Sequence, residues 1–346
     1  MSTVLHYVQR WLPPTEGFVA AVVEGSVHDG RVVSRERPAA EQQRVRRAGS
    51  LHRWHSDRAV RLALAARGLQ ADLVHVHFGY RLRDAQLLLG RRPVVVSLHG
   101  HDATAFARAW PEYYAGVLDR AAAVVVPSSL LARRAEQLGA RAVHVVPSGV
   151  DTRLFAPQPL PRGTDVVFVG RLVEKKGVDV LLRAWPRVRA AVPRARLRVL
   201  GSGPLLDLVR RTASDGVEIR PGAMSPLAVR DALARATVVC TPSRTAADGD
   251  AESLLLVNLE AQAMGRPVVT TQHGGIPEFL GEGAAVVPEN DPGSLADALI
   301  RVLTDRALAE SMAAAGPATA ARFEVRACTR RLDDEVYAPL LSRAEG

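Results

Sequence analysis

The sequence predicts an α/β protein made of two doubly wound, Rossmann-like domains, and three observations favour this fold class. The 346 residues suffice for two domains of ordinary size. Short runs of β-branched residues alternate with helical patterns along the chain. The runs are continuously apolar, which is typical of strands buried on both faces of a parallel sheet.

The elements fall into two series. In the first, the runs expected as strands cover 3–8, 73–79, 93–100, 122–128 and 142–149. In the second, they cover 165–170, 196–201, 216–222, 237–243, 267–271 and 284–288. The connecting segments have helical periodicity, and the one over 129–140 ends near a glycine. One architecture is therefore used twice.

A proline-rich segment without periodicity, 151–165, separates the two series and is typical of an interdomain linker. We expect an N-terminal domain over 1–155 and a second domain over 156–322. Apolar stretches are shorter than the ~18 residues of a membrane span, and the N-terminus lacks the pattern of a signal peptide, so a cytoplasmic protein is expected. Cys240 and Cys328 have no neighbours at metal-binding spacing, and neither a disulfide framework nor a zinc site is expected.

Positive charge is concentrated in the N-terminal half. The net charge is +9, and residues 1–155 contain 21 Arg against 13 Asp and Glu. Such asymmetry favours an anionic partner, including peripheral contact with an anionic membrane. Because the arginines are scattered and lack interleaved aromatic residues, nucleic acid is not expected as a partner.

Parallel sheets bind ligands at the carboxyl ends of their strands, so the loops that follow the runs are the places to look for chemistry. In GRLVEKKG (170–177), Arg171 and Lys176 flank the start of a predicted helix. Free N–H groups and the positive end of the helix dipole favour an anion there. Taken alone, the segment is equally typical of two solvated charges. It is not a P-loop, because Gly-Lys-Ser/Thr is missing.

A second candidate is ESLLLVNLEAQAMGRPVV, which places Glu252 and Glu260 eight residues apart around a predicted helix. If the segment were helical throughout, the two residues would lie ~12 Å apart along the axis. The N–H groups of Leu254, Leu255 and Leu256 would then be free for phosphates between them. Alternatively, Glu252 is a capping acid and Glu260 a solvated helix residue. Together with the cationic loop, the pattern favours a nucleotide-sugar site.

These residues resemble glycosyltransferase family 4, whose members are retaining enzymes of the GT-B fold. The resemblance runs from about Leu73 to Tyr337 and is carried by GRLVEKKGVDVLLRAW, RLRVLGSGP and the Glu-x7-Glu segment with its Gly-Gly-x-Pro-Glu continuation. It implies two Rossmann-like domains that face each other across a cleft, the first binding the acceptor and the second the donor. It also implies that residues 323–346 form a helix that returns to the first domain.

The resemblance implies roles for individual residues. Arg171 and Lys176 would hold the donor diphosphate, Glu252 would contact the transferred sugar and Glu260 the ribose. The His of the family's His-Gly-x-Asp element reaches the reacting sugar. This role implies His99 as a catalytic residue, with His101 and Asp102 beside it as acceptor candidates. No metal and no cofactor other than the nucleotide diphosphate-sugar co-substrate is implied.

Three departures from the family pattern affect the acceptor side more than the donor side. The usual Gly-Phe-Gly after the first Glu is Ser253-Leu254-Leu255 here, and Ser148 stands where Asn is common. The glycine-rich first loop is replaced by LPPTEGFV (12–19), in which only Gly17 allows close backbone approach. Asp248 and Asp250, in the acidic loop before Glu252, are further acceptor candidates.

The sequence therefore predicts a retaining glycosyltransferase. The expected donor is a UDP-hexose or UDP-N-acetylhexosamine, and the acceptor a hydroxyl of a glycan, glycolipid or aminocyclitol. Two alternatives stay open: a GT-B nucleotide-sugar epimerase, which needs no acceptor, and a non-catalytic sugar-nucleotide-binding protein, which shows no turnover.

Overall fold

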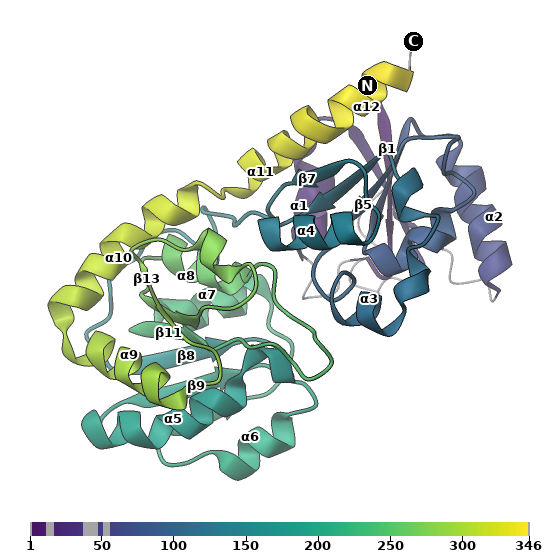
Figure 1. Cartoon of the computed structure of the whole chain (residues 1–346). Helices are drawn as coiled ribbons and strands as arrows, with labels where there is room; N and C mark the ends of the chain where they lie inside the picture. The colour runs from purple at the N-terminus through teal and green to yellow at the C-terminus, as the bar shows by residue number, and fades with distance from the viewer. Residues whose placement is uncertain (1, 12–16, 37–47, 51–55, 345–346) are drawn as a thin grey trace. The chain divides into compact units, whose positions relative to one another are not determined.

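The computed structural model describes residues 2–11, 17–36, 48–50 and 56–344. It contains two compact units, Met1–Gly149 with Val325–Gly346 and Val150–Glu324. Each unit is a parallel sheet with helices on both faces (Figure 1). The predicted pair of doubly wound domains is confirmed.

The sheet of the first unit has the strand order β3-β2-β1-β4-β5-β6-β7. Its strands are β1 (Thr3–Val8), β2 (Asp29–Ser34), β3 (Ala48–Ser50), β4 (Leu73–His77), β5 (Val94–Ser97), β6 (Ala123–Val126) and β7 (Val143–Val145). Its α-helices are α1 (Gly17–Gly25), α2 (Asp57–Gly68), α3 (Ala105–Ala109), α4 (Ser129–Gln137), α11 (Val325–Leu332) and α12 (Ala338–Ala344). A π-helical turn, Asp333–Tyr337, joins the last two, and short 3-10 helices cover Gly79–Ala85, Pro111–Tyr113 and Leu118–Arg120.

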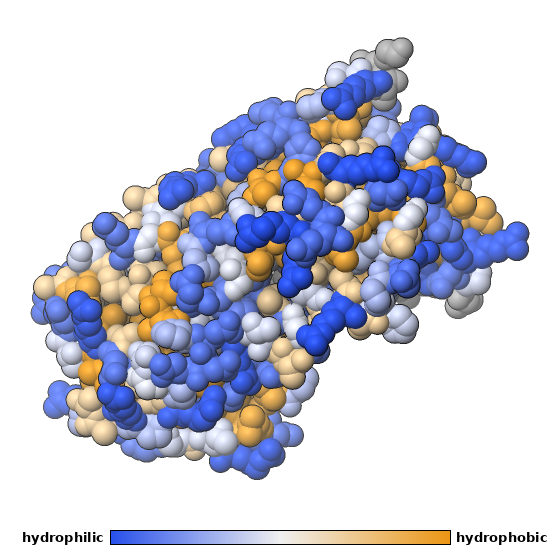
Figure 2. Space-filling view, in the orientation of Figure 1, coloured by the Kyte–Doolittle hydropathy of each residue, from blue (hydrophilic) through white to orange (hydrophobic). Residues whose placement is uncertain are grey.

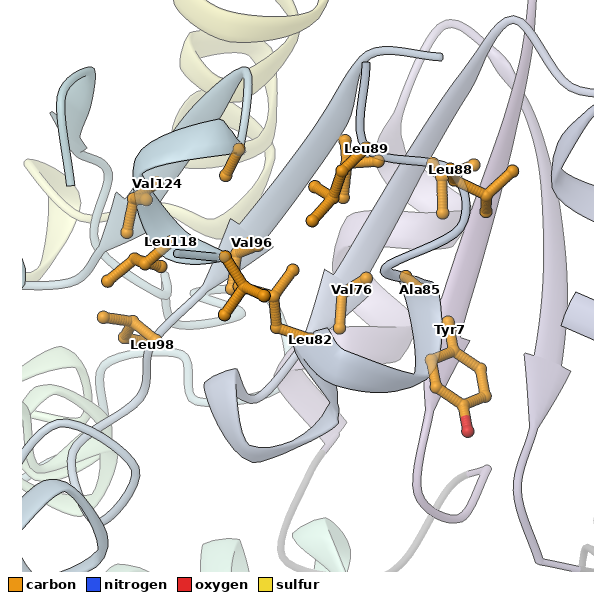
Figure 3. Close-up of a cluster of buried hydrophobic side chains, with 14 of the residues drawn as sticks. Tyr7, Val76, Leu82, Ala85, Leu88, Leu89, Val96, Leu98, Leu118 and Val124 are labelled. Carbon is orange, nitrogen blue, oxygen red and sulfur yellow. The ribbon is translucent and has the colours of Figure 1, made fainter. Parts of the chain in front are cut away.

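Strand residues of the first unit alternate between two buried layers, which explains why the runs are continuously apolar. Val76, Val96 and Val124 come from three neighbouring strands and pack in one layer with Leu82 and Leu118 (Figure 3). On the opposite face, Leu73, Val95 and Val125 pack against Leu332, Val336 and Leu341 of the C-terminal segment. The last residues of the chain therefore belong to the core of the first unit.

The sheet of the second unit has the order β10-β9-β8-β11-β12-β13. Its strands are β8 (Asp165–Val169), β9 (Arg196–Leu200), β10 (Val217–Arg220), β11 (Val238–Thr241), β12 (Val268–Thr271) and β13 (Ala284–Val287). Its α-helices are α5 (Val178–Ala191), α6 (Leu206–Thr212), α7 (Pro226–Ala234), α8 (Leu256–Ala263), α9 (Pro292–Thr304) and α10 (Arg306–Ala321), with short 3-10 helices at Glu174–Lys176 and Ile276–Phe279.

The second sheet is also covered on both faces. Val166 and Phe168 of β8 pack with α5 and α9, whereas Val167 between them packs with α8 on the other face. Helix starts follow from the local sequence: the side chains of Ser225 and Asp291 accept hydrogen bonds from the first turns of α7 and α9.

The structure differs from the sequence expectation at β2 and β3, which were not predicted. β2 has only Val32 and Val33 as apolar residues, and Asp29 and Gly30 at its start are typical of a turn. The strand forms because β1 supplies a parallel partner from Thr3↔Asp29 to Val8↔Ser34. Pairing with β1 thus produces a strand that local propensity does not predict.

The observed division of the chain lies at 149/150 and 324/325, rather than at the predicted 155/156 and 322/323. The reason is that the expected linker packs on the second unit. Val150 and Phe155 are 3% exposed and belong to its core. The Val150 N–H also donates to the Phe323 carbonyl over 2.8 Å, so the two ends of this unit are hydrogen-bonded to each other.

Hydrophilic side chains interrupt the hydrophobic ones over the whole face drawn in Figure 2. Within the described residues, no helix has both the length and the apolar character that crossing a membrane would require.

Candidate functional site

The strand order of the second sheet reverses between β8 and β11, and ligands bind at such switch points. Two of the sequence candidates follow these strands. The loop Gly170–Gly177 begins where β8 ends, and the acidic loop that leads to Glu252 begins after β11. The fold thus brings together two segments that are some 75 residues apart in the sequence.

The two loops are joined by a cluster of ion pairs. The Lys176 Nζ lies 3.0 Å from Glu252 Oε1, and the Lys175 Nζ lies 3.6 Å from the same oxygen. Lys175 Nζ also lies 3.0 Å from Asp250 Oδ1. These two residues are the only lysines among the 346 residues, although the chain has 43 arginines. Sequence reasoning singled out Lys176 and missed Lys175, whose burial no local pattern indicates.

The ion pair keeps Glu252 charged in a buried place. Burial alone would raise the pKa of Glu252, which is 7% exposed, but the charges of Lys176, Lys175 and Arg171 outweigh it and lower that pKa. Burial lowers the pKa of Lys176, and Glu252 opposes the shift only in part. The Glu252 carboxylate and the Lys176 ammonium group thus lie side by side at the switch point of the second sheet.

Backbone contacts hold the two loops close. Gly177 ends the first loop with φ +64°, and a Cβ at this position would lie 1.8 Å from the Pro242 carbonyl oxygen. Gly274, with φ +56°, meets the Glu252 carbonyl oxygen at 1.9 Å in the same way. Only glycine fits either position, because both the dihedral angle and the space exclude a side chain.

Arg171 is exposed, and no ion pair or hydrogen bond of its guanidinium group is present within the described residues. It lies immediately after β8, in the same loop as Lys176. Its charge is therefore available to an anion that binds at the end of the sheet.

Helix α8 begins at Leu256, so the segment between Glu252 and Glu260 is only partly helical. The ~12 Å helical rise expected over these eight residues therefore does not apply. The expected N–H groups are nevertheless available. Those of Leu254, Leu255 and Leu256 donate to no acceptor in the described part of the chain.

Glu260 lies on α8 and is half-buried. Its carboxylate has no hydrogen-bond or ion-pair partner among the described residues. Burial raises its pKa from 4.5 to about 7. An unpaired carboxylate at this depth is unusual for a helix residue with only a structural role.

The two aspartates of the acidic loop have different surroundings. Asp248 is exposed and accepts the N–H of Asp250 over 2.8 Å, which makes it a local turn residue. The Asp250 carboxylate is held by Lys175. Asp250 is thus paired with a buried ammonium group, and its role toward an acceptor stays a prediction.

His273, which sequence reasoning missed, supports Glu252 from the loop that follows β12. Its Nε2 accepts the Glu252 N–H over 3.0 Å, and its Nδ1 lies 3.2 Å from Glu289 Oε2. Burial lowers the pKa of His273, with Glu289 opposing the shift. The residue directly precedes Gly274 in the Gly-Gly-x-Pro-Glu segment, and that position was its only signal in the sequence.

In the first unit, His99 follows β5 and is packed between two aromatic rings. Phe18 and Phe78 each lie 4.7 Å from it, centroid to centroid. Burial lowers the pKa of His99 to about 4, against a smaller opposing effect of Asp102. The imidazole is therefore neutral at pH 7. Phe78 adopts φ 72°, a strained conformation for a bulky residue and one that is common at functional sites.

The other candidates of the first unit have different surroundings. Asp102 is 1% exposed, and its carboxylate accepts the N–H groups of Gly79, His99 and Gly100, each over 2.9 Å. It shapes the loop that carries His99 and is not accessible to an acceptor, which corrects the sequence expectation. His101 is exposed, and Gly17 begins α1. Residues 12–16 of the expected first loop lie outside the described residues.

Three buried histidines, His6, His75 and His77, have ligand atoms within 4.8 Å of one another. Metal-bound imidazoles normally donate their other ring N–H to an acceptor. His6 Nε2 and His77 Nδ1 have no partner among the described residues, and a direct contact of 3.1 Å links His6 Nδ1 to His77 Nε2. The cluster therefore fits a histidine–histidine hydrogen bond better than a metal ion.

Comparisons with known proteins give the same picture over most of the chain. The family model "Glycosyltransferase Family 4" matches residues 18–154, and the model "Glycosyl transferases group 1" matches residues 163–305. The chain is 33% identical over 251 residues to the putative colanic acid biosynthesis glycosyltransferase WcaL of Escherichia coli, covering 66% of this chain and 61% of the relative.

A second relative is the GDP-mannose-dependent alpha-(1-6)-phosphatidylinositol monomannoside mannosyltransferase of Mycolicibacterium smegmatis. It is 34% identical over 257 residues, which cover 66% of this chain and 65% of the relative. The chain thus spans less than two thirds of the length of these curated relatives.

Solved structures show the same fold at low sequence identity. Sucrose-phosphate synthase from Thermosynechococcus elongatus superimposes with a TM-score of 0.82 at 19% identity, covering 99% of this chain and 100% of that one. Anabaena HepE in complex with UDP-glucose gives 0.80 at 18% identity, with 98% and 100% covered. Motifs, fold and family models agree, and the chain belongs to glycosyltransferase family 4.

Proposed function

We propose that the chain transfers a sugar from a nucleoside diphosphate-sugar to a hydroxyl group with retention of the anomeric configuration. The observation that carries the proposal is the convergence of Lys176 on Glu252 at the switch point of the second sheet, beside the unpaired Arg171. A site with two cations, free N–H groups and carboxylates suits a ligand with a diphosphate flanked by two polyhydroxy rings.

In the proposed reaction, the bond between the anomeric carbon and the diphosphate oxygen breaks, and its electron pair leaves with the diphosphate. The acceptor oxygen forms the new bond to the anomeric carbon, and its proton passes to the oxygen of the leaving diphosphate. Arg171, Lys176 and the N–H groups before α8 stabilise the growing negative charge. Glu252 is proposed to act beside the transferred sugar, where positive character develops. His99, whose imidazole is neutral, keeps the role at the reacting sugar that the family resemblance implies.

Glu260 is proposed to hold the ribose. Its carboxylate has no hydrogen-bond or ion-pair partner within the described residues, so both of its oxygens can accept ribose hydroxyls. The proposed nucleotide is UDP, as in the HepE complexes with UDP and UDP-glucose. GDP-mannose is the second candidate, because the mycobacterial relatives at 34% identity are named for it.

The proposed acceptor is a glycan or a lipid-linked glycan. Relatives are named for colanic acid biosynthesis and for a phosphatidylinositol mannoside, and residues 1–155 have a net charge of +8 that suits a membrane-proximal substrate. An aminocyclitol is less well supported, since Asp250, one of the acids that would receive its ammonium group, is paired with Lys175.

The reaction is proposed to need no divalent metal at the diphosphate. Asp250 would be the natural carboxylate ligand, and Lys175 already supplies a positive charge to it at 3.0 Å. Activity is expected to persist in excess EDTA. A loss of activity that Mg²⁺ or Mn²⁺ restores would contradict this part of the proposal.

The direct test measures nucleoside diphosphate release from a panel of UDP- and GDP-sugars, with and without glycan acceptors, and the anomeric configuration of the product by NMR. Release that depends on the acceptor and gives a retained configuration is expected. Release without an acceptor would favour the epimerase, and binding without release would favour a sugar-nucleotide-binding protein. An inverted product would exclude the retaining mechanism.

A further inference from the structure

Lys175 belongs to the ion-pair cluster at the switch point but has no part in the proposed reaction. Its side chain is 6% exposed, against 18% for that of Lys176. Lys175 Nζ lies 3.0 Å from Asp250 Oδ1 and 3.6 Å from Glu252 Oε1. A ligand at the end of the sheet therefore reaches Lys176 more easily than Lys175, which lies close to two carboxylates.

The ion-pair cluster is balanced in charge. Two ammonium groups, Lys175 and Lys176, lie beside two carboxylates, Asp250 and Glu252. Lys176 is the nearer partner of Glu252, at 3.0 Å. The proposed function directs both Lys176 and Arg171 to the diphosphate. Glu252 then needs another positive charge, because a buried carboxylate that loses its partner is strongly destabilising.

The main chains of Glu252 and Lys175 are both fixed by neighbouring loops. The Glu252 N–H donates to His273 Nε2 over 3.0 Å, and the Glu252 carbonyl accepts the Gly275 N–H over 3.1 Å. The Lys175 carbonyl accepts the Arg244 N–H over 2.9 Å. Glu252 therefore stays near Lys175 when Lys176 moves away, and a small side-chain rotation closes the 3.6 Å distance.

We propose that Lys175 is a positioning residue that becomes the main partner of Glu252 when Lys176 turns to the diphosphate. Asp250 holds Lys175 within reach of Glu252 before and after this exchange. Glu252 thus stays ionised and in place while the donor is bound. Naming the ligand that attracts Lys176 rests on the proposed function, whereas the sharing of Glu252 between two lysines does not.

A double-mutant cycle in the ligand-free protein tests whether the two lysines share Glu252. Lys175→Gln and Lys176→Gln each leave Glu252 one lysine, whereas the double variant leaves it neither. At pH 8, the double variant should lower the folding equilibrium constant at least ~10-fold more than the product of the two single effects. Urea unfolding of the full chain measures this excess.

The same cycle in a Glu252→Gln background is the control. Repulsion between the neighbouring lysines is present in both cycles, whereas the carboxylate is present in only one. The excess should therefore disappear in Glu252→Gln, and an excess of equal size in both backgrounds would overturn the proposal. A double variant that folds only in the Glu252→Gln background is the limiting case of the expected result.

The excess should also depend on pH. Without the two lysines, burial raises the pKa of Glu252, so the folded double variant holds a proton more tightly than the unfolded chain does. The penalty of the buried charge then grows as the pH rises above 4.5, and the excess should be smaller at pH 5 than at pH 8. The other charged or titratable groups near Glu252 are unchanged in both cycles: Arg171, Asp250, His273 and Glu289.

Proton uptake on donor binding tests the exchange of partners. Calorimetry of UDP-glucose binding near pH 7, in two buffers of different ionisation enthalpy, gives the number of protons taken up; GDP-mannose is the probe if the protein binds only that donor. Lys175→Gln is expected to take up roughly 0.5–1 proton more than the wild type, because Glu252 loses Lys176 and has no other lysine. Equal uptake in the two proteins would overturn the proposal.

Two further variants make this comparison specific. Arg266→Gln removes another buried cation, whose guanidinium group donates to the carbonyl oxygens of Leu233 and Pro159. It should lower stability and leave proton uptake unchanged. Lys175→Gln combined with Asp250→Asn removes a cation and a carboxylate together, and replaces the single variant if that variant does not fold. It should show the same additional uptake as Lys175→Gln.

The outcomes separate this proposal from the proposed function. An excess that disappears in Glu252→Gln, in a protein that releases no nucleoside diphosphate, would support the sharing of Glu252 and contradict the transferase. Transfer activity with equal proton uptake in Lys175→Gln and the wild type would contradict the role of Lys175 and leave the transferase standing.

Discussion

At the scale of single residues, the proposed donor site depends on charges that a folded protein rarely leaves in such positions. Lys176 and Glu252 form a close, largely buried pair, while Arg171 and Glu260 have no partner within the described residues. A diphosphate would compete with Glu252 for Lys176 and would bind Arg171 without breaking any protein contact. The expected effects of mutation therefore differ from residue to residue.

Replacing Arg171 or Lys176 by Ala should slow turnover by at least ~10²-fold, because each loses a charge that stabilises the leaving diphosphate. Initial rates with the full donor measure this effect. Arg301→Ala, at an exposed position on α9, is the control and should retain full activity. Wild-type rates in both site variants would refute the assignment of the diphosphate site.

The two glutamates should separate binding from turnover. Glu260→Gln should weaken UDP and UDP-sugar alike, by roughly 1–3 kcal/mol, because it loses a charge-assisted hydrogen bond to the ribose. Glu252→Gln should reduce turnover strongly and change UDP affinity little. Calorimetry with UDP and initial rates on both variants give the comparison. The opposite result would reverse the direction of the donor along this segment.

Glu260 should also make donor binding depend on pH. Its pKa in the folded protein is raised from 4.5 to about 7, so the carboxylate that accepts two ribose hydroxyls forms only as the pH rises through that value. The difference in UDP affinity between the wild type and Glu260→Gln should change between pH 6 and pH 8 in favour of the wild type, whereas ionisation of the terminal phosphate of UDP affects both proteins alike. The same shift makes folding less favourable as the pH rises from 4.5 to about 7, because the folded state holds the proton more tightly. An identical pH profile of UDP affinity in the two proteins would refute this role.

At the scale of elements, the site is held by backbone contacts between loops rather than by a single helix. The loop after β8 meets the end of β11 at Gly177, and the loop after β12 meets Glu252 at Gly274. His273, in the loop after β12, accepts a hydrogen bond from the Glu252 N–H and so adds a second contact between that loop and the loop after β11. Because these contacts leave no space for a Cβ, the relative position of the cations and of Glu252 depends on glycine.

Gly177→Ala should therefore weaken UDP binding, because the added Cβ would push the loop away from the Pro242 carbonyl oxygen. Backbone strain without such a contact should not change UDP affinity. Gly116→Ala is the matched control, because Gly116 has a similar φ of +67° but nothing within 4 Å of an added Cβ. The control should lose only the ~1–2 kcal/mol of stability that a left-handed residue costs, with UDP affinity unchanged. Calorimetry and thermal melting on both variants measure the two effects. Equal UDP affinity in both would show that the close approach to Pro242 does not position the site.

At the scale of the whole molecule, net charge is distributed unequally along the sequence, and the core of the first unit is built from both ends of the chain. Residues 1–155 have an excess of eight positive charges, whereas the remainder is nearly balanced. The first unit also includes the C-terminal segment, whose Tyr337 and Leu341 complete its core. A membrane-proximal acceptor would meet the basic half.

The protein should accordingly bind vesicles that contain an anionic lipid and not neutral ones, and this binding should weaken as salt is added. Each basic residue near the surface contributes roughly 1 kcal/mol, and salt screens this attraction over about 10 Å at 0.1 M. Cosedimentation with phosphatidylglycerol and phosphatidylcholine vesicles at low and high salt is the measurement. Equal binding to the two lipids would exclude an electrostatic role for the basic half.

By itself, the sequence determined the fold class and all eleven predicted strands, and it singled out the two loops that the structure brings together at the switch point, because buried parallel strands and strand-end loops leave strong local patterns. Only the tertiary structure decided that β2 forms on β1, that Lys175 and His273 support Glu252, and that Asp102 and Asp250 face inward. Each of these depends on contacts between residues distant in the sequence. Local propensity carries no information about such contacts, since they exist only once the sheets have formed.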